Sequence, residues 1–128
     1  MKFQSDGVHH LSVRVRDLEK AQEFYGGVLG FEVEELSDLR YFAVGPTLVV
    51  LLPTLPGTPA NDRVVDTRVG FDHVAFHVTE RSELEKLADV LAIAGVASAG
   101  IERDPVLDKD YVCFRDPDNT QWEFYCYP

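Results

Sequence analysis

Three side chains in this sequence are candidate metal ligands: His10, His73 and Glu123. Each occupies a polar position in a segment that otherwise alternates as a β-strand does. Two imidazoles and one carboxylate are the donors of a facial triad, which binds a divalent transition metal and leaves coordination positions open. This donor set favours Fe²⁺ or Mn²⁺, with Zn²⁺ and Ni²⁺ as further possibilities. The alternative is two histidines satisfied in a cleft and one solvated glutamate.

The alternation within these segments predicts which face each candidate occupies. In residues 7–15, GVHHLSVRV, the apolar side chains from Leu11 onward face the core, so His10 and Arg14 face the other way. In residues 70–78, GFDHVAFHV, the face of His73 also carries His77. The last strand places Glu123 between Gln121 and Tyr125, opposite the apolar face of Trp122, Phe124 and Cys126.

An internal repeat predicts how the three segments come together. His10 and His73 are 63 positions apart (73 minus 10), as are Gly7 and Gly70, and both halves read strand, helix and about three strands. The predicted fold class is α+β, with two βαβββ repeats forming a cup-shaped mixed sheet and helices on the outside. The expected single domain, 1–128, divides into a module at 7–52, a linker at 53–69 and a module at 70–127.

The remaining elements follow from local signals. Asp17 is expected to cap a helix whose apolar spacing runs from Leu18 to Leu29, and SELE at residues 82–85 reads as a capping box. Further expected elements are strands at Phe31–Leu36, Tyr41–Val44, Thr47–Leu52 and around Val96–Ile101, a charged loop at Glu102–Asp110, and a hairpin at Tyr111–Tyr127. A turn at residues 116–119 would place Cys113 opposite Trp122.

Composition excludes several classes of protein. The 128 residues, 45% hydrophobic and 27% charged, suit one globular domain. A net charge of −10 would repel nucleic acid and acidic membrane surfaces, so neither partner is expected. No apolar run is long enough to span a membrane, and the N-terminus has no signal-peptide pattern, so the expected location is the cytoplasm. Two cysteines do not make a disulfide framework.

Three segments, HHLSVRVRDLEKAQEFYGGVLGFEV, FDHVAFHV and FRDPDNTQWEFY, resemble the vicinal oxygen chelate superfamily, which contains glyoxalase, bleomycin-resistance and extradiol dioxygenase proteins. The resemblance implies that His10, His73 and Glu123 bind the metal. It further implies a small-molecule substrate held through neighbouring oxygens. In glyoxalase I the first half of the chain supplies a glutamate, and the matching position here is expected to be Leu51. A glyoxalase I-like lyase is therefore one alternative, and the expected function is dioxygenase-like, or lyase-like or transferase-like, chemistry.

Further side chains on the open faces are candidates for roles around the metal. His77, Tyr111 and Cys113 are the candidate catalytic residues, and Arg14, Phe42 and Tyr125 the candidate substrate-binding residues; each has the alternative of simply lining the cavity. A metal-free protein that sequesters a drug or metabolite between Phe42, Trp122 and Tyr125 is the main rival function, and a structural interaction module is a third. The site is formed either within one chain or between two chains, and a homodimer is expected.

Overall fold

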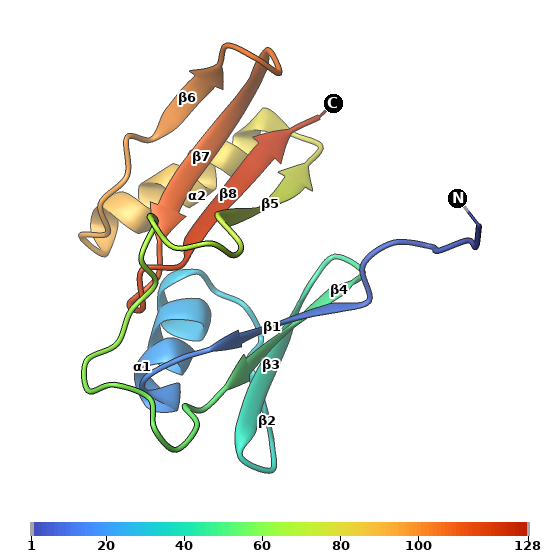
Figure 1. Cartoon of the computed structure of the whole chain (residues 1–128). Helices are drawn as coiled ribbons and strands as arrows, with labels where there is room; N and C mark the ends of the chain where they lie inside the picture. The colour runs from blue at the N-terminus through green and yellow to red at the C-terminus, as the bar shows by residue number, and fades with distance from the viewer. Residues whose placement is uncertain (1, 128) are drawn as a thin grey trace.

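The computed structural model describes residues 2–127 and contains the two βαβββ repeats (Figure 1). The elements of the first module are β1 (His10–Arg14), α1 (Leu18–Gln22), the π-helical η1 (Glu23–Val28), β2 (Glu34–Leu36), β3 (Leu39–Val44) and β4 (Thr47–Leu52). Those of the second are β5 (His73–Val78), α2 (Arg81–Ile93), β6 (Ile101–Asp104), β7 (Lys109–Arg115) and β8 (Gln121–Cys126). The α+β fold class expected from the repeat is thus confirmed.

Each module forms its own four-stranded sheet with the same strand order, β1-β4-β3-β2 in the first and β5-β8-β7-β6 in the second. The first strand of each module pairs in parallel with the last, and the other pairs are antiparallel. His10 and His73 hold the same register position, opposite Leu48 and Gln121. Within residues 2–127 no strand pairs across the two sheets, so the chain does not close into a barrel.

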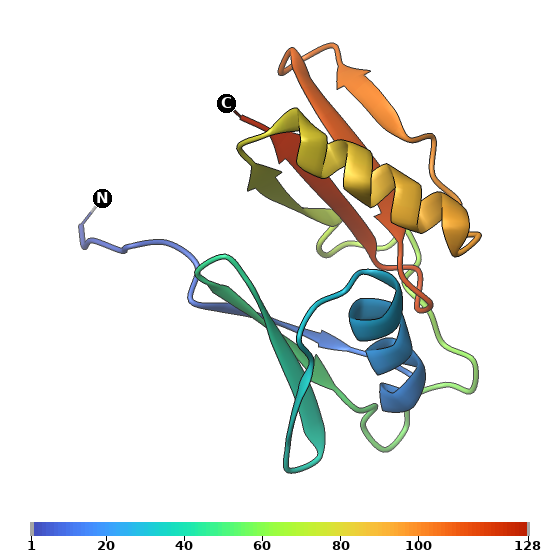
Figure 2. The same ribbon diagram turned by 180° about the vertical axis from the view of Figure 1, so that it is seen from behind.

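One helix covers one face of each sheet and leaves the other face open. Figures 1 and 2 show α2 lying across the back of the second sheet, while α1 and η1 lie beside the first sheet and reach the second module. The alternation predicted for β1 and β5 is confirmed, because Leu11, Val13 and Val74 are partly buried whereas His10 and His73 are exposed. Side chains such as Leu51, Leu84 and Leu91 are fully buried, and the burial of each stabilises the folded state by roughly 1.5–3 kcal/mol.

The two modules are joined by buried polar contacts as well as by the shared core. The Tyr25 hydroxyl donates to the Asp116 carboxylate and accepts from Trp122 Nε1 at 2.9 Å. Arg16 Nε donates to Asp118 Oδ1 at 2.9 Å, and the Arg16 backbone N–H donates to the same oxygen at 3.0 Å. These contacts fix the turn of the β7–β8 hairpin against the start of α1.

Residues 53–69 form a loop without helix or strand, as expected. The loop is held to the hairpin turn, where Val64 N donates to Asp118 O at 2.9 Å and Asn119 Nδ2 donates to Val64 O at 2.8 Å. Among residues 2–127, no helix has the length and apolar sequence that crossing a membrane would require.

The first predicted helix is capped as expected, since Asp17 accepts from Lys20 N, but it is α-helical only to Gln22. The predicted capping box is wrong, because α2 already begins at Arg81. Glu85 is therefore inside the helix, where its carboxylate pairs with Arg81 at 2.7 Å. A first turn of α2 that starts before Ser82 leaves the hydroxyl no cap position to occupy.

The strand expected at Val96–Ile101 and the charged loop expected at Glu102–Asp110 are also wrong. Ile101 begins β6 and pairs with Val112 in β7. The charged stretch is therefore part of a β6–β7 hairpin. Asp104 Oδ1 stabilises the connecting turn by accepting from the backbone N–H groups of Val106 and Leu107. The sequence did not predict this strand, because few of its positions are apolar and the alternation of apolar and polar residues is therefore weak.

Candidate metal centre

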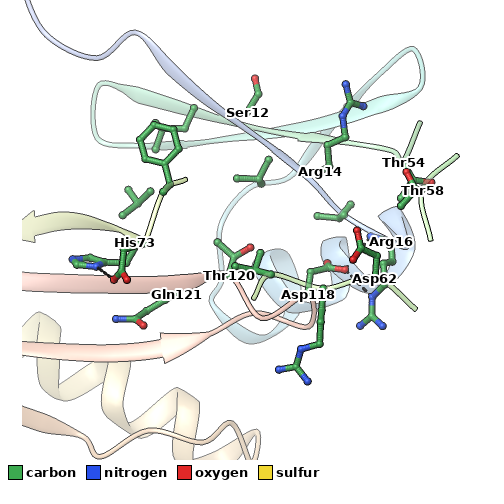
Figure 3. Close-up of a pocket in the computed structure, with 18 of the residues that line it drawn as sticks. Ser12, Arg14, Arg16, Thr54, Thr58, Asp62, His73, Asp118, Thr120 and Gln121 are labelled. Atoms are coloured by element: carbon green, nitrogen blue, oxygen red, sulfur yellow. Dashed lines mark hydrogen bonds and ion pairs between the residues drawn. The ribbon is translucent and has the colours of Figure 1, made fainter. Parts of the chain in front are cut away.

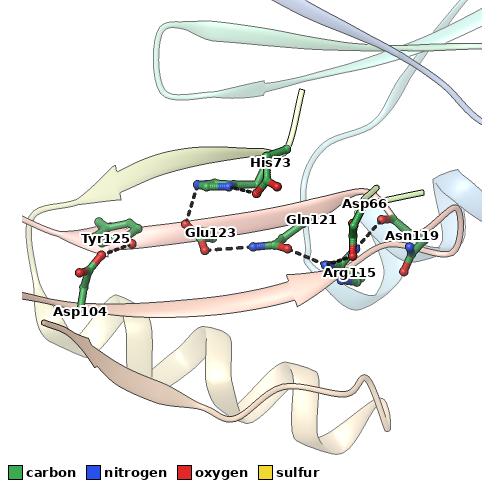
Figure 4. Close-up of polar contacts among 9 residues, drawn as sticks. Asp66, His73, Asp104, Arg115, Asn119, Gln121, Glu123 and Tyr125 are labelled. Carbon is green, nitrogen blue, oxygen red and sulfur yellow. Dashed lines mark hydrogen bonds and ion pairs between the residues drawn. The ribbon is translucent and has the colours of Figure 1, made fainter. Parts of the chain in front are cut away.

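The second module brings two of the candidate ligands together. His73 opens β5 and Glu123 lies at the middle of the neighbouring parallel strand β8, where both side chains point to the open face of the sheet. His73 Nε2 is 3.0 Å from Glu123 Oε2 (Figure 4). Glu123 is only 7% exposed, and a carboxylate buried to this extent costs free energy unless it is paired or binds a cation.

The 3.0 Å contact does not satisfy Glu123, whose Oε2 is buried and makes no hydrogen bond within residues 2–127. The other ring nitrogen, His73 Nδ1, lies 2.7 Å from Asp72 Oδ1. Because a carboxylate only accepts, Nδ1 carries a hydrogen, and Nε2 is the ring nitrogen that faces Glu123. Nε2 and the buried Oε2 that lacks a hydrogen bond are thus the two donor atoms that a cation between these side chains would bind. These residues fit a metal.

The third candidate, His10, lies on β1 in the other sheet. Its Nδ1 is 2.9 Å from His9 Nδ1, and its ring is exposed. Within residues 2–127, no three His, Cys, Asp or Glu side chains converge as a metal site would require. One chain by itself therefore assembles the pair of His73 and Glu123 and does not add His10 to it.

His10 and His73 nevertheless border one cleft of about 550 Å³ between the modules. Figure 3 shows β1 contributing Ser12 and Arg14 to one side, and His73, Thr120 and Gln121 lying across from them. Arg14 Nη1 donates to Pro53 O at 2.7 Å, which anchors the guanidinium beside the cleft. The predicted substrate-binding arginine is thus placed at the edge of a cavity of small-molecule size.

Tyr111, Cys113 and Tyr125 share the open face with Glu123. The rings of Tyr111 and Tyr125 stack with centroids 4.9 Å apart, and the Tyr125 hydroxyl donates to Asp104 Oδ2 at 2.7 Å. Burial raises the pKa of both phenols, and the Asp104 hydrogen bond raises the pKa of Tyr125 further. Both phenols are therefore neutral hydrogen-bond donors at neutral pH.

Cys113 lies directly opposite Glu123 in the ladder, which corrects the expected pairing with Trp122 by one residue. The turn at Asp116–Asn119 forms as expected, but Arg115 pairs with Gln121, so five residues separate the paired positions. Burial raises the pKa of the Cys113 thiol, and the Glu123 carboxylate raises it further. The thiol is therefore protonated near neutral pH, and a thiol is a weaker nucleophile than a thiolate.

His77 and Phe42 differ in what they face. His77 lines a second hollow of about 610 Å³ together with His73, Ala75 and Tyr125. Phe42, in contrast, is 2% exposed and stacks between Tyr25 and Phe31 in the core. The prediction that Phe42 contacts a substrate does not fit this position, because the side chain faces the helix-covered side of β3.

Residues 7–124 match the family model described as the glyoxalase/bleomycin resistance protein/dioxygenase superfamily. The chain belongs to this superfamily. The match covers both modules and includes His10, His73 and Glu123.

Relatives of known sequence and structure agree with membership of the superfamily. The chain is 32% identical over 120 residues to metallothiol transferase FosB of Lysinibacillus sphaericus, covering 92% of this chain and 80% of FosB. It is 29% identical to protein YwkD of Bacillus subtilis over 125 residues, covering 92% of this chain and 94% of YwkD. A glyoxylase/bleomycin resistance protein/dioxygenase domain from Frankia sp. EAN1pec superposes with a TM-score of 0.84 at 27% identity, covering 98% of this chain and 100% of that domain.

The first module of this superfamily member has no counterpart of Glu123. In the first module Ser12 pairs with Val50, and at the corresponding place in the second module Ala75 pairs with Glu123. The residue that matches Glu123 is therefore Val50 and not the expected Leu51. Leu51 faces the opposite side and is fully buried. The conclusion that the first module offers no carboxylate at this position is unchanged, since both residues are aliphatic.

Two residues at the site were missed from the sequence. Asp72 contacts His73, although alternation placed it on the opposite face; it precedes β5 and is outside the strand. Gln121 Nε2 donates to Glu123 Oε1 at 3.1 Å. Its position two residues before Glu123 on the same face was the signal that could have identified it.

Proposed function

We propose that this superfamily member is a metal-dependent enzyme that binds neighbouring oxygens of a small organic substrate at a divalent cation. His73 and Glu123 of one chain would hold the cation, and His10 would complete the ligand set. The favoured cations are Fe²⁺ and Mn²⁺, which suit two imidazoles and a carboxylate. Transferase-like or dioxygenase-like chemistry is favoured, and similarity to a protein named metallothiol transferase supports a metal-dependent role.

The observation that carries this proposal is the buried, unbonded Glu123 Oε2 located 3.0 Å from His73 Nε2. A buried carboxylate oxygen that lacks a hydrogen bond costs free energy, on the order of 1–3 kcal/mol or more. Folding alone gives no reason to leave this buried oxygen without a hydrogen bond. A cation that both atoms bind gives that reason.

When bound, the cation would supply Lewis-acid stabilisation of negative charge that develops on a substrate oxygen. The chain's own side chains would surround the substrate. Tyr111 would donate a hydrogen bond, and Arg14 would orient an anionic or carbonyl group from the edge of the cleft. His77, which lines the second hollow, is the candidate for accepting or delivering a proton.

We further propose that His10 comes from a second copy of the chain. The open face of the first sheet carries Leu48, Val50 and Leu52 beside His10, and these apolar side chains are only partly buried. Phe71, next to the cleft, is 92% exposed. A homodimer that pairs the open face of one module with that of a partner would cover this surface and bring the two sets of donors together.

Metal analysis of the purified protein tests the first part of the proposal. Wild-type protein, purified anaerobically and titrated with Mn²⁺, is expected to bind one ion per chain, and His73→Ala and Glu123→Ala are expected to lose binding. His77→Ala is the matched control, because His77 lies on the same strand face and is not a proposed ligand. Wild-type protein that binds none of Fe²⁺, Mn²⁺, Zn²⁺ or Ni²⁺ would contradict the metal-dependent function.

A complementation experiment tests the second part. His10→Ala and Glu123→Ala chains, carrying different tags, are co-expressed and the mixed dimer is isolated. If each site uses His10 of one chain and Glu123 of the other, the mixed dimer has one intact site and binds one metal ion, whereas either variant alone binds none. A mixed dimer that also binds none would show that the donors come from the same chain.

A further inference from the structure

We infer that Asp72 and Gln121 are positioning residues, which determine the atoms that His73 and Glu123 present to the cation. The inference rests on the proposed function, but it concerns different residues and can be tested without metal. Each of the two proposed ligands has two atoms that could bind. In each case a neighbouring side chain occupies one of them and leaves the other free.

Asp72 acts on the imidazole. Asp72 Oδ1 lies 2.7 Å from His73 Nδ1, and a carboxylate can only accept, so the ring hydrogen is held at Nδ1. Nε2 is then the ring nitrogen that is left for a cation, and it lies on the side of Glu123. A carboxylate in this position also makes the imidazole a stronger ligand, because it stabilises the positive charge that the ring gains on binding a cation.

Gln121 acts on the carboxylate. Its Nε2 donates to Glu123 Oε1 at 3.1 Å, while Glu123 Oε2 makes no hydrogen bond within the described residues. The amide cannot rotate to exchange its ends, because Arg115 Nη2 donates to Gln121 Oε1 at 2.7 Å and a guanidinium only donates. Figure 4 shows Arg115, Gln121, Glu123 and His73 in one continuous series. Oε2 is therefore the carboxylate oxygen that remains for the cation.

The series extends into the loop between the modules. Asp66 receives two hydrogen bonds from Arg115, at 3.0 Å to Oδ1 and 3.1 Å to Oδ2. A two-point contact of this kind fixes the plane of the guanidinium as well as its position. Asp66 thus holds Arg115 in the orientation that directs the amide of Gln121 at Glu123.

The first module repeats the arrangement at its histidine. His9 directly precedes His10, as Asp72 precedes His73, and its Nδ1 lies 2.9 Å from His10 Nδ1. In both modules the residue before the strand histidine therefore occupies Nδ1 and leaves Nε2 free. His9 supplies a ring nitrogen, which can donate or accept, where Asp72 supplies a carboxylate, which only accepts, so the constraint on His10 is the weaker one.

Nuclear magnetic resonance of metal-free protein tests the inference first. With ¹⁵N-labelled histidine, His73 is expected to carry its hydrogen on Nδ1, and Asp72→Ala is expected to shift the ring toward the Nε2–H tautomer. Asp72→Asn keeps an acceptor and is expected to preserve the wild-type tautomer. For Gln121, the side-chain amide signals are expected to move in Glu123→Ala and to stay unchanged in His77→Ala. An Nε2–H tautomer in wild-type protein, or amide signals insensitive to Glu123→Ala, would overturn the inference.

Metal affinity supplies the second readout. Asp72→Ala and Gln121→Leu are each expected to weaken Mn²⁺ binding about 10–100-fold, with Asp72→Asn intermediate. Asp89→Ala, which removes an exposed carboxylate from α2, is the matched control and is expected to bind as wild type does. Wild-type affinity in Asp72→Ala would overturn the inference and leave the proposed function standing. A wild-type protein without metal affinity would contradict the proposed function, while the tautomer and amide signals would still decide the roles of Asp72 and Gln121.

Discussion

Tyr25, in the π-helical turn of the first module, donates its hydroxyl hydrogen to Asp116 at the β7–β8 turn of the second. Both residues are buried, and Trp122 Nε1 donates to the same hydroxyl at 2.9 Å. This phenol thereby satisfies two polar groups of the other module. It also fixes how the two sheets are placed, on which the cleft between His10 and His73 depends.

Tyr25→Phe is expected to lower the free energy of unfolding by about 1–3 kcal/mol, because Asp116 and Trp122 each lose a buried partner. Urea unfolding followed by Trp122 fluorescence measures the change. Tyr41→Phe serves as the control, since that hydroxyl makes no hydrogen bond within the described part of the chain. Equal stability of Tyr25→Phe and Tyr41→Phe would show that the Tyr25 hydroxyl does not join the modules.

The same phenol predicts a loss of stability at alkaline pH. Burial, followed by the charge of Asp116, raises the pKa of Tyr25 well above its ordinary value of about 10. In the unfolded chain the phenol ionises near pH 10, so the unfolded state loses its proton first and is favoured as the pH rises. Stability is therefore expected to be complete below pH 10 and to fall above it, with a smaller fall in Tyr25→Phe. Parallel pH profiles for the two proteins would contradict the prediction.

Introducing a carboxylate into the first module tests the strand register. Val50→Glu places the new side chain on the open face at the counterpart of Glu123, so the protein is expected to remain folded and to bind Mn²⁺ at least as tightly as wild type. Leu51→Glu buries a charge in the core and is expected to unfold the chain. Circular dichroism and metal titration distinguish the two, and a reversed result would show that the register is displaced by one residue.

Phe42 is expected to matter for stability and not for ligand binding. Phe42→Ala removes a core side chain stacked on Tyr25 and Phe31, which typically costs about 3–5 kcal/mol. Phe71→Ala makes the same change at an exposed position and is expected to alter stability by no more than about 0.5 kcal/mol. Thermal unfolding of both variants checks the difference, and a stable Phe42→Ala protein would place this ring outside the core.

The sequence was sufficient to predict the faces of the strands that carry the candidate ligands. Alternation is a local property, and the apolar residues beside His10 and His73 determine which side turns inward. The repeat predicted the fold, because two halves with the same order of helix and strands pack in the same way. Register was harder: the expected positions of Cys113 and of the counterpart of Glu123 were each displaced by one residue. A turn sequence indicates where the chain reverses, but not which pair of residues closes the ladder.

The relative position of the two modules was beyond what periodicity can predict. It depends on particular buried contacts, such as Tyr25 with Asp116 and Arg16 with Asp118, whose side chains carried no distinguishing pattern. The roles of Asp72 and Gln121 were missed for a related reason. Asp72 precedes β5, so alternation could not give the direction of its side chain. The spacing of Gln121 gave the strand face that it shares with Glu123, but not which carboxylate oxygen it contacts.

The parallel pairing of β5 with β8 has a consequence for biosynthesis. His73 emerges from the ribosome early in the second module, but β8, the strand that lies beside it, is the last strand of that module. Contacts between segments so distant along the chain form slowly, because a long intervening loop must be closed first. A nascent chain that ends before β8 would leave both edges of β5 unpaired and lack Glu123, so neither the second sheet nor the ligand pair can form until β8 has been synthesised.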